Sequence, residues 1–218
     1  MPPKGLEPSG IILVDKPAGP SSFGVLARVR SRTRTKMGHA GTLDPFATGL
    51  LLLLSGRATK LAARFVGLDK RYLTEVDLRR RTTTGDPEGE VVEEHGPPAP
   101  EELDARLVAL RGAVELPIPA ASAVKIDGQR AYKLHRQGVA VEMPLRRSRV
   151  EMLDLLAYAD GIARLDLRVS SGTYVRALAE ALGGHCLTLR RTEIGPFRVE
   201  DADEHCIVPA DEALALLP

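Results

Sequence analysis

The segment from Gly38 to Gly49 holds the side chains whose types and spacing are best suited to chemistry. Three glycines and one proline surround its two ionisable groups, His39 and Asp44. Loops fixed between regular elements commonly carry catalytic groups, and a carboxylate in such a loop can act as a nucleophile. An aspartate before a proline is also a common turn residue, so the local sequence leaves both interpretations of Asp44 open.

Other familiar binding patterns are absent from the sequence. The chain has no Gly-x-x-x-x-Gly-Lys phosphate loop and no Gly-x-Gly-x-x-Gly dinucleotide motif, which argues against a nucleotide cofactor. The pairs His185-Cys186 and His205-Cys206 are adjacent in sequence, unlike the separated ligands of zinc sites. We therefore expect neither a metal ion nor an organic cofactor.

The charges of the chain are distributed unevenly, although its net charge is only +1. Residues 1–81 hold 15 lysines and arginines against 6 aspartates and glutamates, whereas the remainder holds 15 against 23. A basic part of this kind is typical of contact with nucleic acid. A protein whose charges merely cluster would show the same counts, so both interpretations stay open.

Five basic residues follow one another at every second position from residue 28 to residue 36. In an extended segment they would line one side at a spacing that follows phosphates. At the end of a helix they would instead form a solvated cationic terminus, favoured by the helix dipole. The sequence does not decide between these alternatives for Arg28, Arg30, Arg32, Arg34 and Lys36.

Hydrophobic periodicity and turn residues predict the elements that must position these groups. We expect strands over residues 10–14 and 72–78, a Leu-rich core strand that follows the loop and ends at Gly56, a hairpin partner of 72–78 over 90–93, and a hairpin of 150–157 with 162–169. We expect helices over residues 57–66, 101–110 and 174–182, and one capped by Ser21 or Ser22 with Val25, Leu26 and Val29 on one face. Because strands dominate and hairpins outnumber βαβ patterns, the sequence predicts an α+β fold around a mostly antiparallel mixed central sheet with flanking helices.

The length and the cysteine content of the chain limit the classes of protein to which it can belong. A chain of 218 residues fits one large domain or two small ones. Cys186 and Cys206 provide no disulfide framework, so we expect a cytoplasmic location, where thiols stay reduced. The apolar run from Leu50 to Leu54 is far too short to span a bilayer.

Six stretches of the chain, in this order, resemble the TruB family of bacterial tRNA pseudouridine synthases. The segment from Gly38 to Gly49 is similar to that family's signature loop, Gly-His-x-Gly-x-Leu-Asp-Pro-x-Ala-x-Gly. The other stretches are Val14-Asp15-Lys16-Pro17 with Ser21-Ser22, Asp69-Lys70-Arg71-Tyr72, Ser122-Ala123-Val124-Lys125 with Gly128, Ser171-Gly172-Thr173-Tyr174-Val175-Arg176, and Leu189-Arg190-Arg191. Each stretch alone is weak evidence of this resemblance, but the six stretches in this order are highly specific to the family.

This resemblance implies a pseudouridine-synthase-like fold and an isomerase that converts uridine 55 in the T arm of tRNA to pseudouridine. It implies that Asp44 is the nucleophile, that no cofactor is needed, and that neither a membrane nor an obligate protein partner takes part. A related synthase acting on another RNA is a second possibility. A non-catalytic RNA-binding or RNA-folding protein that keeps the fold is the alternative from a different class.

The resemblance also implies the partners of Asp44. Arg176 matches the arginine that pairs with the nucleophile, whereas its alternative role is a surface helix pair with Glu180. Tyr72 matches a tyrosine that stacks on the target base and takes part in proton transfer. Its alternative role is that of an ordinary strand aromatic.

The remaining candidates are implied to bind the substrate. His39 matches a histidine that enters the space left when the target base leaves its stack, a step that costs a few kcal/mol. Tyr174 and Leu189 match residues that line the pocket of the flipped nucleotide, although both could be core residues. Lys16 and Asp86 complete the substrate-binding set.

Two departures from the family pattern affect these expectations. Thr83 stands where many members carry an additional acid, which leaves Asp86 as the acid of that segment. The chain ends at Pro218, where many members continue into a PUA domain. We therefore expect residues 1–218 to form a single catalytic domain without a PUA domain.

Overall fold

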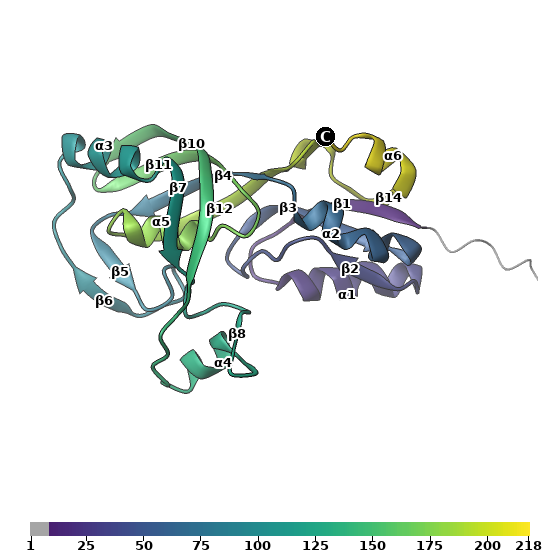
Figure 1. Cartoon of the computed structure of the whole chain (residues 1–218), viewed down its shortest axis with the longest axis horizontal. Coiled ribbons are helices and arrows are strands. Elements are labelled where there is room, and N and C mark those ends of the chain that lie inside the picture. The colour runs from purple at the N-terminus through teal and green to yellow at the C-terminus, as the bar shows by residue number, and fades with distance from the viewer. Residues whose placement is uncertain (1–8) are drawn as a thin grey trace, which may run out of the picture. The chain divides into compact units, whose positions relative to one another are not determined.

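The computed structural model of the chain describes residues 9–218 and divides them into two compact units (Figure 1). Unit 1 holds the described residues up to Leu73 together with Leu189–Pro218, and unit 2 holds Thr74–Thr188. Both boundaries fall within strands, one in β4 (Lys70–Asp77) and one in β12 (His185–Ile194).

Beyond β4 and β12, the elements of unit 1 are β1 (Gly10–Lys16), α1 (Ser22–Thr33), β2 (Met37–His39), β3 (Thr48–Ser55), η1 (Gly56–Leu61), α2 (Ala62–Val66), β13 (Phe197–Arg198), η2 (Val199–Asp201), β14 (Asp203–Pro209) and α6 (Ala210–Ala215). Those of unit 2 are β5 (Arg80–Thr82), β6 (Val91–Glu94), α3 (Pro100–Ala109), β7 (Gly112–Pro117), β8 (Lys125–Ile126), β9 (Gln129–Arg130), α4 (Ala131–Arg136), β10 (Leu145–Ala159), β11 (Ile162–Val169) and α5 (Val175–Ala181).

Ten strands form one sheet in the order β14-β1-β3-β12-β4-β11-β10-β7, with β2 beside β3 and β13 beside β12. The pairs β1–β14, β1–β3, β10–β11 and β10–β7 are antiparallel, whereas β3 and β12 run parallel. The sheet is therefore mixed and mostly antiparallel, and helices accompany it. This confirms the α+β class expected from the sequence.

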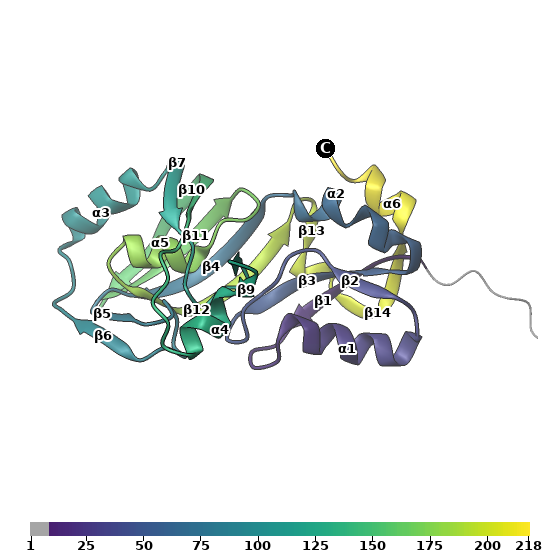
Figure 2. The ribbon, with the colours of Figure 1, turned by 60° about the horizontal axis from the view of Figure 1, so that its bottom comes forward.

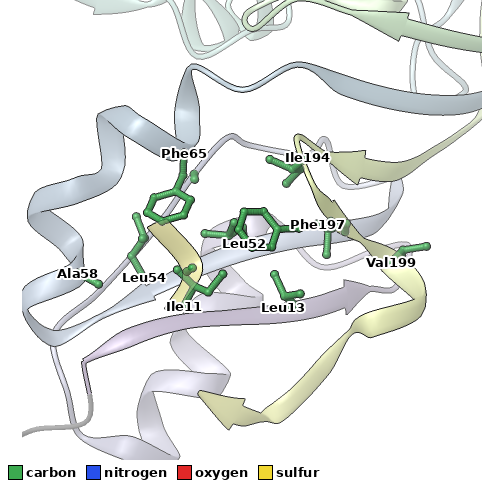
Figure 3. Packing of buried hydrophobic residues seen from close by; sticks show 12 residues of the cluster. Ile11, Leu13, Leu52, Leu54, Ala58, Phe65, Ile194, Phe197 and Val199 are labelled. Carbon is green, nitrogen blue, oxygen red and sulfur yellow. The ribbon is translucent and has the colours of Figure 1, made fainter. Parts of the chain in front are cut away.

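The core of unit 1 lies on both faces of β1 and β3, because successive side chains of a strand point to opposite faces. Figure 2 shows α1 on one side of these strands and α2 and α6 on the other. The cluster on the α2 and α6 side is shown in Figure 3 and includes Ile11, Leu13, Leu52, Leu54, Phe65, Ile194 and Phe197. The cluster under α1 includes Ile12, Val14, Leu51 and Leu53. A strand buried on both faces has a continuous apolar sequence, as residues 50–54 do.

Helix α1 has the cap and the buried face that the sequence predicts. The Ser21 hydroxyl accepts a hydrogen bond from the Gly24 amide at 3.1 Å. Val25, Leu26 and Val29 are buried, so the expected apolar face is confirmed.

Arg28, Arg30 and Arg32 lie in α1, Arg34 is its C-cap residue and Lys36 follows the helix, so the run is not one extended segment and that alternative is wrong. Residues two apart on a helix point in widely different directions, and the basic side chains therefore do not share one side. Arg28 and Arg32, one turn apart, each lie 2.7 Å from a carboxylate oxygen of Glu204. These hydrogen bonds lower the pKa of Glu204 to about 2. Arg30 and Arg34 are exposed and form no ion pair with any described residue.

Two sequence expectations need correction. The strand at residues 91–94, β6, pairs with β5 and not with the strand at 72–78, because β4 already has β12 and β11 on its two sides. The helix expected over residues 57–66 begins as a 3-10 helix, η1, and only Ala62–Val66 is α-helical.

The hairpin of β10 and β11 in unit 2 is as expected. Its turn residues Asp160 and Gly161 have φ angles of 51° and 74°, the conformation of a two-residue type I′ turn. Helix α5 follows Tyr174, as its apolar spacing predicts, and Gly183 beyond its end has a φ of 96°.

Candidate functional site

The loop that carries Asp44 connects two paired strands of unit 1. β2 lies antiparallel to β3 with His39 opposite Leu53, and the Ala40 amide donates to the Leu52 carbonyl at 2.9 Å. Beyond Asp44 the chain turns at once, with the Ala47 amide 3.2 Å from the Asp44 carbonyl oxygen. Asp44 itself is half-buried. The loop between β2 and β3 is therefore short, and backbone hydrogen bonds hold it next to the buried strand β3.

Lys16, at the end of β1, fixes the second half of this loop from inside. Its side chain is fully buried, and its Nζ donates to the carbonyls of Pro45 at 3.1 Å and Ala47 at 2.6 Å. A third donation reaches the Pro17 carbonyl at 3.0 Å. Because none of Lys16 is exposed, the geometry supports a part in holding the loop rather than direct contact with a substrate.

Arg191, in β12, fixes both ends of the loop. It is 1% exposed, and its Nε donates to the Leu50 carbonyl at 2.7 Å. Its Nη2 donates to the Gly41 carbonyl at 3.1 Å, and its Nη1 lies 3.5 Å from the carbonyl oxygen of Thr42. Sequence reasoning included Arg191 in a motif but gave it no role. The available signal was its place two residues after Leu189 in a strand, which puts both side chains on one face.

Two further contacts hold the residues on either side of Asp44. The buried Ser22 hydroxyl both accepts from the Leu43 amide and donates to the Leu43 carbonyl, each at 2.8 Å. The Gly19 amide donates to the Pro45 carbonyl at 2.8 Å. The backbone is therefore anchored immediately before and immediately after Asp44.

Burial and the charge of Arg191 change the titration of two neighbouring groups. Burial first, and then Arg191, lower the pKa of His39, which favours the neutral imidazole. The Nδ1 of His39 is buried and has no hydrogen-bond partner among residues 9–218. The same two causes lower the pKa of Lys70 to about 8. Lys70 donates to the carbonyls of Val66 and Leu68, the former at 2.6 Å.

The other expected site residues divide between the two units. Tyr72 in β4 and Leu189 in β12 belong to unit 1 and are 7% and 6% exposed, respectively. Unit 1 thus holds five of the candidates: Lys16, His39, Asp44, Tyr72 and Leu189. Unit 2 holds the remaining three: Asp86, Tyr174 and Arg176.

Arg176 lies in the first turn of α5 and is only 2% exposed. Its guanidinium donates to the carbonyls of Thr84 at 2.6 Å and Ala121 at 3.0 Å, and lies 3.3 Å from a carboxylate oxygen of Asp86. The alternative of a surface pair is therefore wrong as to location, because Arg176 is an interior residue, although its charge still acts on Glu180. Glu180 is itself half-buried, and burial raises its pKa.

Asp86 belongs to a tight turn built beside Arg176. Its carboxylate accepts from the Thr84 hydroxyl at 2.5 Å and from the Glu88 amide at 3.0 Å, and the residue is 4% exposed. Gly85 has a φ of 69°, and a Cβ there would lie 2.3 Å from a carboxylate oxygen of Glu180. These contacts direct the Asp86 carboxylate towards the interior of unit 2.

Tyr174 precedes α5 as its N-cap residue and is half-buried. It lines a small depression of unit 2 together with Leu116, Pro117, Arg146, Ser148, Thr173 and Ala177. Over residues 9–218, no group of three or more His, Cys, Asp or Glu side chains is arranged to hold a metal ion. In the same part of the chain, no helix combines the length and apolar character needed to cross a membrane.

Comparison with known proteins assigns the chain to a family. Residues 28–175 match the family described as TruB family pseudouridylate synthase (N terminal domain). The chain belongs to the TruB family of pseudouridylate synthases. It is 45% identical over 208 residues to tRNA pseudouridine synthase B of Mycobacterium sp. (strain KMS), covering 88% of this chain and 69% of that protein. The corresponding protein of Leifsonia xyli subsp. xyli (strain CTCB07) is 42% identical over 230 residues, covering 98% and 76%.

A solved structure supports the fold. The chain is similar to one in the crystal structure of a Cbf5-Nop10-Gar1 complex, with a TM-score of 0.67 and 26% identity. The match covers 87% of this chain and 50% of the other, so the chain spans about half the length of that relative. The resemblance inferred from the motifs and the pseudouridine-synthase-like fold are both confirmed.

The shifted pKa of Lys70 predicts a pH dependence of stability. Between about 8, its folded pKa, and 10.5, its ordinary value, the unfolded chain binds more protons than the folded chain. The free energy of unfolding should therefore gain a contribution as the pH rises through this window, by up to roughly 3 kcal/mol. Urea unfolding across the window should show this gain in the parent protein and lose it in Lys70→Met. The exposed Lys60→Met is the matched control, and equal slopes in both variants would contradict the prediction.

Proposed function

We propose that the chain is a tRNA pseudouridine synthase that converts uridine 55 of the T arm to pseudouridine with Asp44 as its nucleophile. Membership of the TruB family, and relatives named tRNA pseudouridine synthase B at 42–45% identity, support this reaction. The observation that carries the role of Asp44 is its loop, where buried side chains anchor the backbone on both sides of this residue. A reacting group held in this way avoids part of the entropic cost of reaching the transition state.

The proposed reaction breaks the bond between C1′ and N1 of the uridine, rotates the base and joins C1′ to C5. The hydrogen on C5 is released, and N1 of the product carries a hydrogen, so the overall change is an isomerisation without oxidation or reduction. A carboxylate suits this task because it stabilises or captures an electron-poor sugar carbon, as in retaining glycosidases.

For this role the Asp44 carboxylate must be ionised where water is excluded. Burial alone would favour its protonated form, so nearby positive charge has to compensate. The ammonium of Lys16 lies 3.1 Å from the carbonyl of Pro45 and so places positive charge beside the residue that follows Asp44. We assign Arg176 as the catalytic cation, consistent with the family motif it occupies.

The remaining side chains receive roles in binding the flipped nucleotide. A neutral His39 fits the space left by the base, because an uncharged ring enters a base stack at a smaller desolvation cost. Tyr72 is assigned to stack on the base, and Tyr174 and Leu189 to line its pocket. The burial of Lys16 and Asp86 favours supporting roles for both, the first for the Asp44 loop and the second for Arg176.

Asp44→Asn should abolish turnover while tRNA binding stays within about threefold, because the amide keeps the shape but is not a nucleophile. Pseudouridine formation on a T-arm hairpin and the dissociation constant should be measured on the same sample. Glu75→Gln, at a partly exposed position of β4, is the control for loss of one carboxylate. Multiple turnovers by a pure Asp44→Asn sample would remove Asp44 from the mechanism.

Arg176→Lys should lower the single-turnover rate by roughly a hundredfold with a much smaller effect on folding, because a point charge does not replace a planar fork. Rapid-quench assays at saturating hairpin would measure the rate, and thermal melting would measure the fold. Arg164→Lys, at an exposed position of β11, is the matched control. A rate equal to that of the control would show that the fork has no part in catalysis.

The basic end of α1 should contribute to RNA affinity through Arg30 and Arg34, which no described acid neutralises. Arg30→Gln with Arg34→Gln should weaken hairpin binding and make the plot of log K against log salt shallower by roughly one to two units. Arg28→Gln with Arg32→Gln removes the same charge from residues already paired with Glu204 and should change the slope less. Equal slopes for the two double variants would place the RNA elsewhere. Rates at saturating RNA should stay near the parent value.

A further inference from the structure

We propose that Arg191 is the positioning residue that holds the two ends of the Asp44 loop in register for catalysis. This inference rests on the proposed function, in which Asp44 is the reacting group. Arg191 acts through backbone carbonyls and is therefore distinct from the residues assigned to substrate contact.

The burial of Arg191 is the first argument. Arg191 is among the largest fully buried side chains of the described chain, and Lys16 is the other charged one in that group. Removing a guanidinium from water costs several kcal/mol, and apolar residues of similar volume often stabilise a core as well or better. A buried arginine is therefore poorly explained by stability alone and better explained by what its donors hold.

The distribution of its hydrogen bonds is the second argument. Its Nε and Nη2 reach the carbonyls of Leu50 and Gly41, at 2.7 Å and 3.1 Å, so one rigid fork joins residues from the two sides of Asp44. Lys16 instead contacts the second half of the loop through Pro45 and Ala47. The planar guanidinium holds its donors in fixed, diverging directions on the two sides of Asp44, whereas the ammonium of Lys16 is a compact charge on a flexible stem.

The register of the strands shows how this contact is possible. Arg191 lies opposite Gly49 in the parallel pair of β12 and β3. A Cβ at Gly49 would lie 2.2 Å from the Arg191 carbonyl oxygen, and Gly49 has a φ of 100°. Gly41, also with a φ of 100°, would place a Cβ 3.6 Å from Nη1 of Arg191. Gly49 thus allows β3 to lie directly against the Arg191 backbone, and the positive φ of Gly41 favours glycine at the turn beside the guanidinium.

The preceding residue provides a control built into the same strand. Arg190 is partly exposed and forms a two-pronged ion pair with Asp15, at 2.8 Å and 3.0 Å. Its side chain points to the opposite face from Arg191, because neighbours alternate along a strand. Replacing Arg190 removes the same chemical group from β12 without touching the Asp44 loop.

The experiment compares Arg191→Lys and Arg191→Met with Arg190→Lys and Arg190→Met in the full chain. Three quantities are measured: the single-turnover rate at saturating T-arm hairpin, the hairpin dissociation constant, and hydrogen exchange of residues 38–50 in the free enzyme. Both Arg191 variants should bind within about threefold of the parent but react at least about tenfold more slowly. Their loop amides, including Ala40 and Ala47, should exchange faster. The Arg190 variants should match the parent in rate and loop exchange.

Three outcomes contradict the inference. Unchanged rate and loop exchange in both Arg191 variants would show that the loop holds itself, and failure of both variants to fold would make Arg191 a structural residue only. A fall in affinity with an unchanged saturating rate would place Arg191 in RNA binding. If the parent and the Arg190 variants form no pseudouridine, the proposed function fails. Loop exchange still decides whether Arg191 holds the loop.

Discussion

The structure of unit 1 depends on the need to satisfy two cations buried beneath a glycine-rich loop. Lys16 and Arg191 are 0% and 1% exposed, and a buried charge without partners would cost more free energy than a domain has to spare. Their acceptors are backbone carbonyls of the loop and of the nearby Pro17 and Leu50, so those carbonyls must face inward. The sheet supplies the rest: β1 delivers Lys16, β12 delivers Arg191, and β3 provides the buried strand from which the loop departs.

Unit 2 has a similar arrangement of a buried cation and backbone carbonyls around Arg176. There too a buried guanidinium is met by backbone carbonyls, from Thr84 and Ala121, and a carboxylate from Asp86 balances its charge. Short loops rich in glycine and threonine have few side chains of their own to pack. A buried cation that donates hydrogen bonds to the backbone carbonyls of such a loop can fix the loop without a large apolar core. In both units a buried cation and a loop that it holds are thus among the motif residues that resemble the family.

Much of the fold could be predicted from local pattern, because apolar periodicity, the Ser21 cap and the Asp160-Gly161 turn are set by neighbours in sequence. Pairing between distant strands was harder: β6 was expected beside β4, but both sides of β4 are occupied by strands far away along the chain. The site shows the same division. Asp44 could be proposed from its loop, whereas the proposed role of Arg191 depends on burial, which the sequence alone does not reveal. The contact of Arg28 and Arg32 with Glu204 joins residues more than 170 positions apart.

In the proposed reaction, the anchored loop presents Asp44 to a uridine, and the enzyme converts that uridine to pseudouridine. The most direct measurement is release of tritium from a T-arm hairpin that carries 5-tritiated uridine at position 55, since C5 loses its hydrogen when it joins C1′. The proposed reaction should release one tritium for each hairpin, over many turnovers, and none when the only labelled uridine lies in the stem. Tight binding of the hairpin without release at position 55 would contradict it. The chain would then be a protein that binds or folds RNA without modifying it.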